Sequence, residues 1–481
     1  MFGIFENVEY EVINKGKDFV INDIHYDSRK IRENDVFCAL IGAVTDGHDY
    51  IEKAVNSGAK MILAERRDIE VINTDVTYIF IDNLRKHLGV IASNFFGWPQ
   101  KNLKIIGITG TNGKTTSSYI LDSMLEKTSR IGTIGYKILD EEIEAPNTTP
   151  ESLDLVKMLD KSVKKGVEYF IMEVSSHALE IGRVDMLEFD SVMFTNLTQD
   201  HLDYHENMEN YYNAKFKLFS MLRNKDAAAV NTDDFYGERI YNSNKNYKSY
   251  SIIKDSDLKG NIEEYHNEGM RASVIFQGKE YSFDTKLVGD YNLYNILGCM
   301  GVLLNLGFGM EDIVERIKRV GYVPGRFELV NEGQDFRVIV DYAHTDNGLE
   351  NILETVRKIT ENRVITIFGA GGDRDNTKRP KMAKAAAKYS DFVIITSDNP
   401  RTEDPSEITK QVERGLADID FPKEKYTVIV DREQAIKYGI EMSAAKDSLL
   451  IAGKGHEDYQ IIGREKIHFD DREQARKYLK K

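Results

Sequence analysis

Short apolar runs alternate with stretches of helical periodicity along most of this 481-residue chain. The alternation is clear in residues 35–81. A new series begins at Lys104, where KIIGITG runs into the helical pattern KTTSSYILDSMLEK. The alternation returns from Phe327 onward. Apolar runs separated by helical stretches of roughly 10–15 residues are typical of βαβ units. The pattern therefore predicts an α/β fold with mostly parallel sheets.

Two proline-containing segments interrupt this alternation and mark candidate domain boundaries. A helical pattern over residues 84–98 stops at Pro99, and the segment VPGRF occupies residues 323–327. Between them, residues 245–290 are expected to form short strands, with helices over 208–222 and 291–307. At roughly 150 residues per domain, the length also indicates about three domains. We therefore predict a smaller N-terminal α/β domain (1–100), a central domain (101–324) and a C-terminal Rossmann-like domain (325–481).

Charge and composition narrow the class of protein. The formal net charge of −15 argues against general nucleic-acid binding, which needs a basic surface, but a single nucleotide needs only local groups. No apolar run reaches the ~18 residues of a spanning helix, and the N-terminus lacks a secretory signal pattern. The only cysteines are Cys38 and Cys299, far apart in the sequence. We expect a cytoplasmic protein without a membrane or nucleic-acid partner, and expect it to be a monomer.

The segment GITGTNGKTT, residues 107–116, has the strand–loop–helix context of a phosphate-binding loop. Its glycines allow backbone N–H groups to face phosphate oxygens, and the helix N-terminus adds positive potential. Lys114 would bridge phosphates and the Thr115 hydroxyl would bind Mg²⁺. The spacing departs from G-x-x-x-x-G-K-[ST], because the first glycine position is Ile108. The candidate nucleotide-binding residues of the loop are Gly110, Thr111, Asn112, Gly113, Lys114, Thr115 and Thr116.

Acidic and imidazole side chains follow the next predicted strands. Glu173 ends the apolar run YFIM, where a carboxylate can reach a cation held against a triphosphate. Residues 200–205 alternate acids and histidines: Asp200, His201, Asp203 and His205. No CxxC and no other zinc-type ligand pattern accompanies them, so the segment does not favour a zinc site. The SSH segment at 175–177 raises a Ser-His hydrolase as an alternative, but it lacks the G-x-S-x-G motif.

Taken together, these motifs resemble those of the Mur ligase family. TGTNGKTT is similar to the phosphate loop of that family and of the related folylpolyglutamate synthases, and the three-domain plan covers essentially the whole chain. The resemblance implies that His201 assists a second Mg²⁺ and that Lys215 is carbamylated to N6-carboxylysine, with Lys217 as the rival position. It also implies ATP contacts from Asn292, Asn295, Arg326 and Asp341. The chain departs from the family at Asp346, where a proline is frequent.

Within the family, the chain resembles the MurE type, which adds the third residue of the peptidoglycan stem peptide. The segments DSR (27–29), TDGHDY (45–50) and NTTPES (147–152) carry this resemblance. It implies that UDP-N-acetylmuramoyl-dipeptide is bound by Ser28, His48, Asn147, Thr148, Thr149, Ser175 and Arg183. Without the resemblance, DSR and TDGHDY would be interpreted as turns. Ile181 stands where the family often has glutamine.

The C-terminal domain carries GGDRD (371–375), DNPRTEDP (398–405) and AGKGHEDYQ (452–460). The DNPR pattern is associated with addition of meso-diaminopimelate rather than L-lysine. Arginines can pair with the distal carboxylate and Glu457 can accept the distal ammonium. The predicted amino-acid contacts are Arg374, Asp398, Asn399, Pro400, Arg401, Gly453 and Glu457. The same end groups occur in meso-lanthionine, so both diamino diacids stay open.

The resemblance implies an ATP- and Mg²⁺-dependent ligase of peptidoglycan synthesis that acts through an acyl phosphate, with Lys114, Glu173, His201 and Lys215 at the reaction centre. Two Mg²⁺ ions would be held by Thr115, Glu173, His201 and the carbamate of Lys215. The alternatives are folylpolyglutamate synthase, a nucleotide-switch or motor NTPase, and a binding module gated by ATP. The long N-terminal domain and the DNPR segment favour the ligase over the first alternative.

Overall fold

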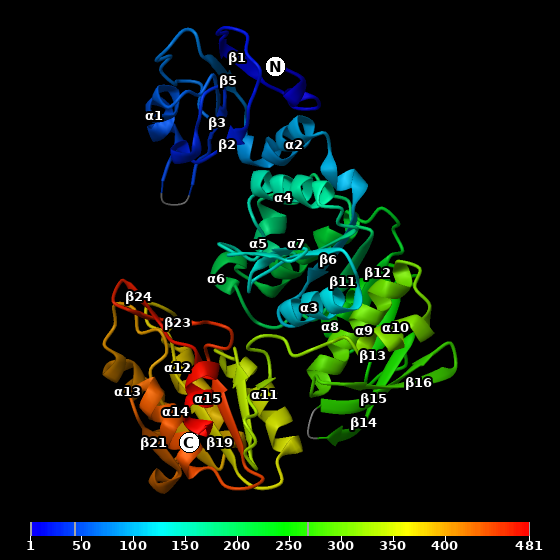
Figure 1. The fold of residues 1–481 in the computed structure, drawn as a ribbon, viewed down its shortest axis with the longest axis vertical. Coiled ribbons are helices and arrows are strands. Elements are labelled where there is room, and N and C mark those ends of the chain that lie inside the picture. Colours follow the sequence, from blue (N-terminus) through cyan, green and yellow to red (C-terminus); the bar gives the residue numbers. More distant parts are fainter. Residues whose placement is uncertain (1, 43–44, 267–268, 481) are drawn as a thin grey trace. The chain divides into compact units, whose positions relative to one another are not determined.

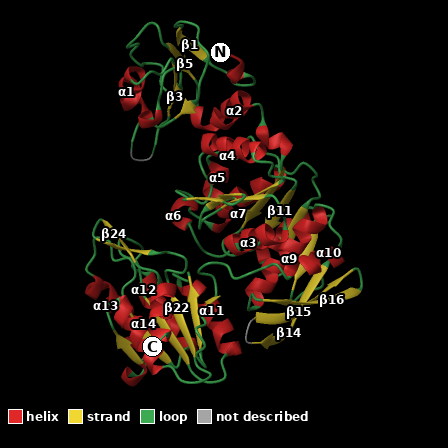
Figure 2. Cartoon of the chain, viewed as in Figure 1, coloured by secondary structure: helices red, strands yellow, loops and turns green. Residues whose placement is uncertain are grey.

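The computed structural model describes residues 2–42, 45–266 and 269–480 (Figure 1). Helices alternate with strands through most of the chain (Figure 2), as the apolar pattern predicts. The strands form three main sheets and a separate two-stranded hairpin. The chain divides into two compact units, which are residues Met1–Gly260, Val274–Tyr281 and Tyr294–Arg319, and residues Asn261–Ser273, Ser282–Leu293 and Val320–Lys481.

The N-terminal sheet has the strand order β1-β5-β4-β3-β2 and is parallel except for β1. Strands β3 and β4 are buried at every position, as expected for parallel strands covered on both faces. Helix α2 packs against α4 of the following sheet, and their apolar residues join one core cluster (Figure 1). The elements are β1 (Glu11–Asn14), β2 (Ile24–His25), β3 (Val36–Ala39), α1 (Ile51–Asn56), β4 (Met61–Ala64), β5 (Thr77–Phe80) and α2 (Leu84–Phe96).

The central sheet has the order β16-β15-β14-β13-β12-β11-β6-β10-β7-β8-β9. Strands β7, β10, β6, β11, β12, β13 and β14 pair in parallel, so the carboxyl ends of β6 and β10 lie side by side. The strands are β6 (Lys104–Thr109), β7 (Thr128–Ile131), β8 (Tyr136–Ile138), β9 (Glu141–Ile143), β10 (Tyr169–Glu173), β11 (Ser191–Phe194), β12 (Ala228–Asn231), β13 (Lys248–Ser251), β14 (Leu258–His266), β15 (Gly269–Phe276) and β16 (Lys279–Thr285).

Helices of the predicted type accompany these strands. The expected helices over 114–127, 208–222 and 291–307 correspond to α3, α7 and α9. The strands expected over residues 245–290 are present, but β14 and β15 have nine and eight residues and are longer than predicted. The helices are α3 (Lys114–Met124), α4 (Ser152–Lys164), α5 (Ser176–Glu180), α6 (Leu202–His205), α7 (Met208–Ser220), α8 (Phe235–Ser243), α9 (Asp290–Asn305) and α10 (Met310–Ile317).

The C-terminal sheet has the order β17-β18-β22-β19-β20-β21 and is parallel except for β17. Helices α11, α12 and α13 pack on one apolar face and α14 and α15 on the other. The strands of this sheet are β17 (Glu328–Leu329), β18 (Arg337–Asp341), β19 (Val364–Phe368), β20 (Phe392–Ile395), β21 (Tyr426–Val428) and β22 (Ser448–Ala452), and the separate hairpin consists of β23 (Tyr459–Ile462) and β24 (Glu465–His468). The helices are α11 (Asp346–Ile359), α12 (Lys378–Tyr389), α13 (Pro405–Ala417), α14 (Arg432–Met442) and α15 (Asp471–Leu479).

No helix within the described residues is long and apolar enough to cross a membrane.

Candidate functional site

The phosphate loop lies between β6 and α3, and its backbone depends on two glycines. Gly110 and Gly113 have φ values of +147° and +87°. A Cβ on Gly110 would collide with the Thr195 hydroxyl, and one on Gly113 would collide with the Asn295 amide. Gly113 is the N-cap of α3, and no side chain in the described chain caps this helix. The first-turn N–H groups are therefore suited to binding an anion.

Lys114 begins α3 and its side chain folds back over the loop. Its Nζ donates to the carbonyls of Gly110 and Thr111 at 2.9 and 2.8 Å. Thr111 is further tied to Thr198 through backbone N–H and hydroxyl groups. The loop is thus held against the segment that follows β11, and its lysine lies beside the helix N-terminus.

Glu173, at the carboxyl end of β10, joins the phosphate loop to a neighbouring segment. Its carboxylate is fully buried and accepts hydrogen bonds from the Thr115 hydroxyl at 3.0 Å and from the Thr133 hydroxyl at 3.1 Å. Its backbone carbonyl accepts a bond from the Thr149 hydroxyl at 2.8 Å. One residue therefore contacts both the phosphate loop and the NTT segment, residues 147–149.

Lys215 reaches the same loop from α7. Its side chain is 2% exposed, and its Nζ donates to the Gly110 carbonyl at 2.8 Å. Burial, together with the nearby charge of Lys114, holds the pKa of Lys215 well below its usual value. Lys217 differs, because its side chain is partly exposed and its Nζ pairs with Asp185 at 2.7 Å.

The histidines of residues 200–205 do not converge. His201 has φ +51° and is mostly exposed near Asp200, whereas His205 is buried with its Nε2 2.8 Å from the Ser176 hydroxyl. The side chain of Asp203 lies outside the described residues. Among the described residues, no three His, Cys, Asp or Glu side chains form a metal-binding group. The paired oxygens of Thr115 and Glu173 instead suit a hard cation completed by phosphate oxygens.

The NTT segment, Ser175 and Arg183 form one hydrogen-bonded group around Thr149. The Ser175 N–H donates to the Thr149 hydroxyl at 3.1 Å, and Arg183 Nη1 donates to the Thr149 carbonyl at 2.9 Å. The Thr148 hydroxyl lies 3.0 Å from that of Thr133, and the Asn147 carbonyl accepts from Tyr136. These residues, far apart in the sequence, therefore lie together beside Glu173.

In the N-terminal domain, Ser28 is buried at the start of a short 3₁₀ helix capped by Asp27. His48 is constrained through its ring, because its Nδ1 bonds to Asp46 and its Nε2 accepts from the Glu65 N–H at 3.1 Å. Both ring nitrogens of His48 are thus engaged inside this domain. We therefore expect His48 to shape the substrate-binding surface and not to bind the substrate through a ring nitrogen.

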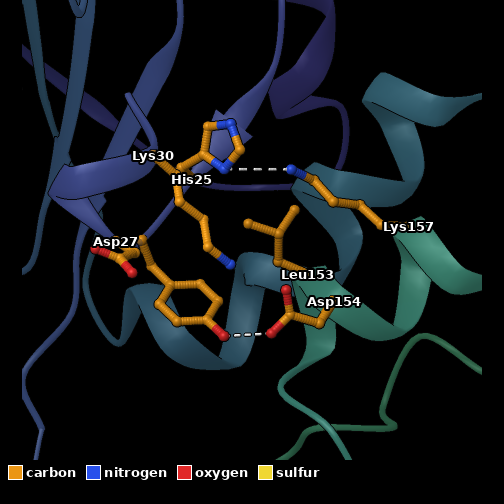
Figure 3. Close-up of a pocket in the computed structure, with 7 residues that line it drawn as sticks. His25, Asp27, Lys30, Leu153, Asp154 and Lys157 are labelled. Carbon is orange, nitrogen blue, oxygen red and sulfur yellow. Dashed lines mark hydrogen bonds between the residues drawn. The ribbon is translucent and has the colours of Figure 1, made fainter. Parts of the chain in front are cut away.

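A small pocket is lined by residues of this domain and of α4 (Figure 3). Tyr26 contributes a hydroxyl that donates to Asp154, and Lys157 donates to the Ile24 carbonyl at 2.7 Å. Burial alone would raise the pKa of Asp23, but hydrogen bonds from His25 and Lys157 hold it well below its usual range. The pocket is lined by His25, Tyr26, Asp27, Lys30, Leu153, Asp154 and Lys157.

The remaining predicted nucleotide residues lie on α9 and around β18. Asn295 is within reach of the Ser117 hydroxyl at 3.4 Å, and Asn292 bonds to the Val288 carbonyl at 2.8 Å. Asp341 is buried and accepts from the N–H groups of Phe327 and Ala343, both at 2.7 Å. Burial raises the pKa of Asp341.

Arg326 stacks on the Tyr342 ring, with its guanidinium carbon 4.6 Å from the ring centroid. Its buried Nε has no hydrogen-bond partner among the described residues.

The three C-terminal motifs meet at the carboxyl ends of β19, β20 and β22. Asn399 Nδ2 donates to Glu457 Oε2 at 2.9 Å, joining the second motif to the third. Arg401 donates to the Gly372 carbonyl at 2.7 Å, joining the second to the first. A Cβ on Gly371 would meet Arg401 Nη1 at 3.1 Å and Arg374 Cγ at 3.8 Å, so both arginines border this turn.

A buried arginine fixes these turns. Arg379 on α12 pairs with Glu403 and donates to the Gly371 carbonyl at 3.1 Å. Asp373 in turn bonds to Glu403 and Thr402. The turns that carry Arg374 and Arg401 are therefore locked together.

Two residues of the site have no role that the sequence motifs predict. Thr133 follows β7 outside any motif and donates to Glu173 through both its N–H, at 3.1 Å, and its hydroxyl. Lys454 stands between Gly453 and Glu457 and is fully buried among acids. A lysine between two glycines, GKG, is the only sequence signal for Lys454, and Thr133 has none.

Comparison with family models covers most of the chain. Residues 20–96 match the model described as Mur ligase family, catalytic domain. Residues 108–303 match the Mur ligase middle domain, and residues 325–455 match the Mur ligase, glutamate ligase domain.

Curated relatives match nearly the full length. The chain is 50% identical over 484 residues to UDP-N-acetylmuramoyl-L-alanyl-D-glutamate–2,6-diaminopimelate ligase of Fusobacterium nucleatum, covering 99% of this chain and 98% of the relative. It is 44% identical over 486 residues to the ligase of the same name from Clostridium botulinum, covering 99% of each. A solved structure of a ligase with that name superposes with a TM-score of 0.68 at 31% identity, covering 96% of this chain and 95% of the other. The predicted three-domain α/β fold class is confirmed.

Proposed function

The chain belongs to the Mur ligase family, and from this premise we propose that it joins 2,6-diaminopimelate, in its meso form, to UDP-N-acetylmuramoyl-L-alanyl-D-glutamate at the expense of ATP. The relatives from Fusobacterium nucleatum and Clostridium botulinum are named for this ligase and match almost the whole chain. The product would be the tripeptide precursor of peptidoglycan. We further propose that the enzyme works as a cytoplasmic monomer with domain boundaries near residues 100 and 324.

The observation that carries the proposal is the double engagement of Glu173. Its side chain bonds to Thr115 of the phosphate loop, and its backbone carbonyl bonds to Thr149 of the NTT segment. A ligase must bring the acceptor carboxylate to the γ-phosphate, so a phosphate site and a dipeptide site must be neighbours. An NTPase switch would not need the second site.

The chemistry follows from what a carboxylate requires before it reacts with an amine. The terminal carboxylate of the dipeptide attacks the γ-phosphorus, ADP leaves, and an acyl phosphate forms. The amine of diaminopimelate then attacks the acyl carbon, the acyl C–O bond breaks as phosphate leaves, and the nitrogen releases a proton as the amide forms. The α3 N-terminus and Lys114 would hold the phosphates in line and offset their charge.

We propose that Thr115, Glu173, His201 and a carbamate on Lys215 hold two Mg²⁺ ions, which would neutralise charge on the transferred phosphoryl group. The adjoining oxygens of Thr115 and Glu173 support this assignment. Carbamylation needs a neutral amine, and burial favours the neutral form of Lys215. The exposed ion pair of Lys217 makes it the poorer candidate.

For ATP, the proposed further contacts are Asn292, Asn295, Arg326 and Asp341. For the dipeptide substrate they are Ser28, His48, Asn147, Thr148, Thr149, Ser175 and Arg183. Arg374 and Arg401 would pair with the distal carboxylate of diaminopimelate, because guanidinium groups bind carboxylates in a bidentate manner. Lysine lacks that carboxylate and would leave both arginines unpaired.

The test is phosphate release with ATP, Mg²⁺ and the UDP-linked dipeptide, with meso-diaminopimelate, meso-lanthionine or L-lysine as the amine. We expect release that needs both the dipeptide and a diamino diacid, with lysine inactive. Release with lysine alone would retain the ligase and contradict the arginine pocket. Turnover indifferent to the UDP-linked dipeptide would contradict the ligase itself.

A further inference from the structure

Lys454 is a fully buried cation in the proposed amino-acid site. It follows β22 in the turn Gly453–Gly455, whose two glycines have φ values of +117° and +54°. Its Nζ lies 3.1 Å from Glu457 Oε2, 3.3 Å from Asn399 Oδ1 and 3.8 Å from Asp398 Oδ1. Three oxygens from two separate loops therefore surround one amine.

This amine determines how Asn399 is oriented. Asn399 Oδ1 accepts from Lys454 and from the Ile461 N–H at 2.9 Å, so the other amide atom, Nδ2, must face Glu457. An amide with two donors directed at one end cannot flip without losing both bonds. Lys454 thereby fixes the donor that Asn399 presents to Glu457.

Only one oxygen of the Glu457 carboxylate accepts hydrogen bonds from the described residues. Both Asn399 Nδ2 and Lys454 Nζ donate to its Oε2, and among the described residues no hydrogen bond to its Oε1 is formed. The side chain of Glu457 is 15% exposed, while that of Lys454 is wholly covered. The second oxygen of Glu457 is thus oriented by the lysine and available to a ligand.

The charges of the cluster do not cancel. Asp398 and Glu457 carry two formal negative charges against the one positive charge of Lys454. Arg432 also acts electrostatically on Asp398 and Glu457, but Asp471 balances its charge through Nε–Oδ1 at 2.7 Å and Nη2–Oδ2 at 2.6 Å, so the five groups keep a net formal charge of −1. Asp398 Oδ1 is buried, and within the described chain it has no hydrogen-bond partner. A buried carboxylate oxygen of this kind calls for one further cationic donor.

We propose that Lys454 is a positioning residue that sets the specificity of this site for an amino acid bearing one ammonium group beside a carboxylate. This inference rests on the proposed function. Lys454 orients Asn399 and Glu457, and it reduces the charge of the acidic pair to a net formal charge of −1, which matches a single ammonium. Glu457 and Arg401 both act electrostatically on the same two side chains, Tyr342 and Tyr459, so a carboxylate-binding group borders the ammonium site.

The test compares Lys454→Met, Lys454→Gln and the surface control Lys446→Met, whose lysine pairs with the exposed Glu361. KM is measured separately for meso-diaminopimelate, ATP and the UDP-linked dipeptide. Hydroxylamine is also supplied in place of the amino acid, since it attacks an acyl phosphate to give a hydroxamate and phosphate without using the amino-acid site.

We expect Lys454→Met to raise the KM for diaminopimelate about tenfold or more while the other two KM values stay within about twofold, since hydrogen bonds to a charged group are lost only in this site. Hydroxamate formation should match the wild type. Lys454→Gln should show a smaller rise, because its amide still donates a hydrogen bond but carries no charge. Lys446→Met should behave as wild type.

An unchanged KM for diaminopimelate in either Lys454 variant would overturn the inference. So would a fall in hydroxamate formation with all KM values unchanged, because that would indicate a purely structural role. If Lys454→Met does not fold, Lys454→Gln decides alone. A wild type that forms no hydroxamate and does not bind diaminopimelate would overturn the proposed function together with this inference, whereas an active wild type with unaffected variants overturns this inference only.

Discussion

At the scale of single residues, the buried amine of Lys215 gives the most specific prediction about the reaction chemistry. Keeping a charged ammonium in a buried site costs free energy, because the group loses its hydration. The pKa of Lys215 is lowered by burial and by Lys114. A neutral amine can react with CO₂ to form a carbamate, and a carbamate on Lys215 would place an anionic oxygen ligand beside the phosphate loop.

We therefore expect Lys215→Ala to lose about a hundredfold or more of the phosphate-release activity, since the variant cannot form the proposed metal-binding carbamate. Lys217→Ala is the matched control on the same helix and should retain most activity, because Lys217 pairs with Asp185. Comparable losses in both variants would contradict the assignment of Lys215.

Carbamylation of Lys215 should also make the activity depend on CO₂ and pH. Below its lowered pKa the amine is protonated and cannot react with CO₂, so carbamate forms as pH rises through that value. We expect activity in CO₂-depleted buffer to fall and to return on adding bicarbonate, with the largest effect at the acidic end of the profile. Activity that is insensitive to CO₂ at every pH would contradict carbamylation.

The backbone geometry of the phosphate loop requires a glycine at position 110. At φ +147° an alanine is strained, and its Cβ would overlap the Thr195 hydroxyl. We expect Gly110→Ala to abolish detectable binding of a fluorescent ATP analogue, because the loop must open to admit the methyl group. Gly309→Ala is the control, since Gly309 has φ −80° and among the described residues nothing lies within 4 Å of its Cβ position. Wild-type nucleotide affinity in Gly110→Ala would contradict this account of the loop.

At the scale of elements, a buried ion pair ties α14 and α15 to the C-terminal sheet. Arg432 and Asp471 are both wholly buried, and Arg432 also donates to the carbonyls of Ala452 at 2.9 Å and Ser397 at 3.3 Å. Desolvating two charges costs several kcal/mol, so the pair contributes little net stability by itself. Removing one partner leaves the other charge buried and uncompensated.

We expect Arg432→Met to lower the free energy of unfolding by about 3–5 kcal/mol, and the double variant Arg432→Met/Asp471→Leu to recover much of this loss. Urea denaturation followed by circular dichroism measures both. Lys437→Met on the same helix should change stability little, because its pair with Glu441 is loose and exposed. A double variant as unstable as the single would show that the carbonyl contacts of Arg432, rather than the charge balance, carry the stability.

The elements that the sequence predicts are those with a strong apolar period. Strands β6, β10 and β18 and helices α3, α7 and α9 fall where the pattern predicts them, because each buries a continuous apolar face. The candidate site is less predictable. Thr133 binds Glu173 through parallel strand pairing that brings β7 beside β10, and no local pattern encodes that pairing. In the sequence, Lys454 is marked only by its two flanking glycines, and folding brings Asp398 of another loop beside it, together with Glu457 of its own loop.

At the scale of the whole molecule, the described apolar cores segregate with the two compact units. The cluster that joins α2 to α4 and β6 lies in the first unit, as does the smaller cluster around Phe37 and Tyr78. The clusters on the two faces of the C-terminal sheet lie in the second unit. The N-terminal and central sheets therefore share a core, although the sequence predicts them as separate domains.

Shared cores unfold cooperatively, so we expect scanning calorimetry to give two transitions rather than three. The nucleotide and the amino acid should act differently on these two transitions. A non-hydrolysable ATP analogue with Mg²⁺ should raise the first unit's melting temperature, because the phosphate loop belongs to that unit. Diaminopimelate at about 100 times its Kd should add roughly 2.7 kcal/mol to the second unit alone. Lys454→Met should lose the shift from diaminopimelate and keep the shift from the nucleotide. A single transition without ligand, or a diaminopimelate shift in the first unit, would contradict this division of the sites.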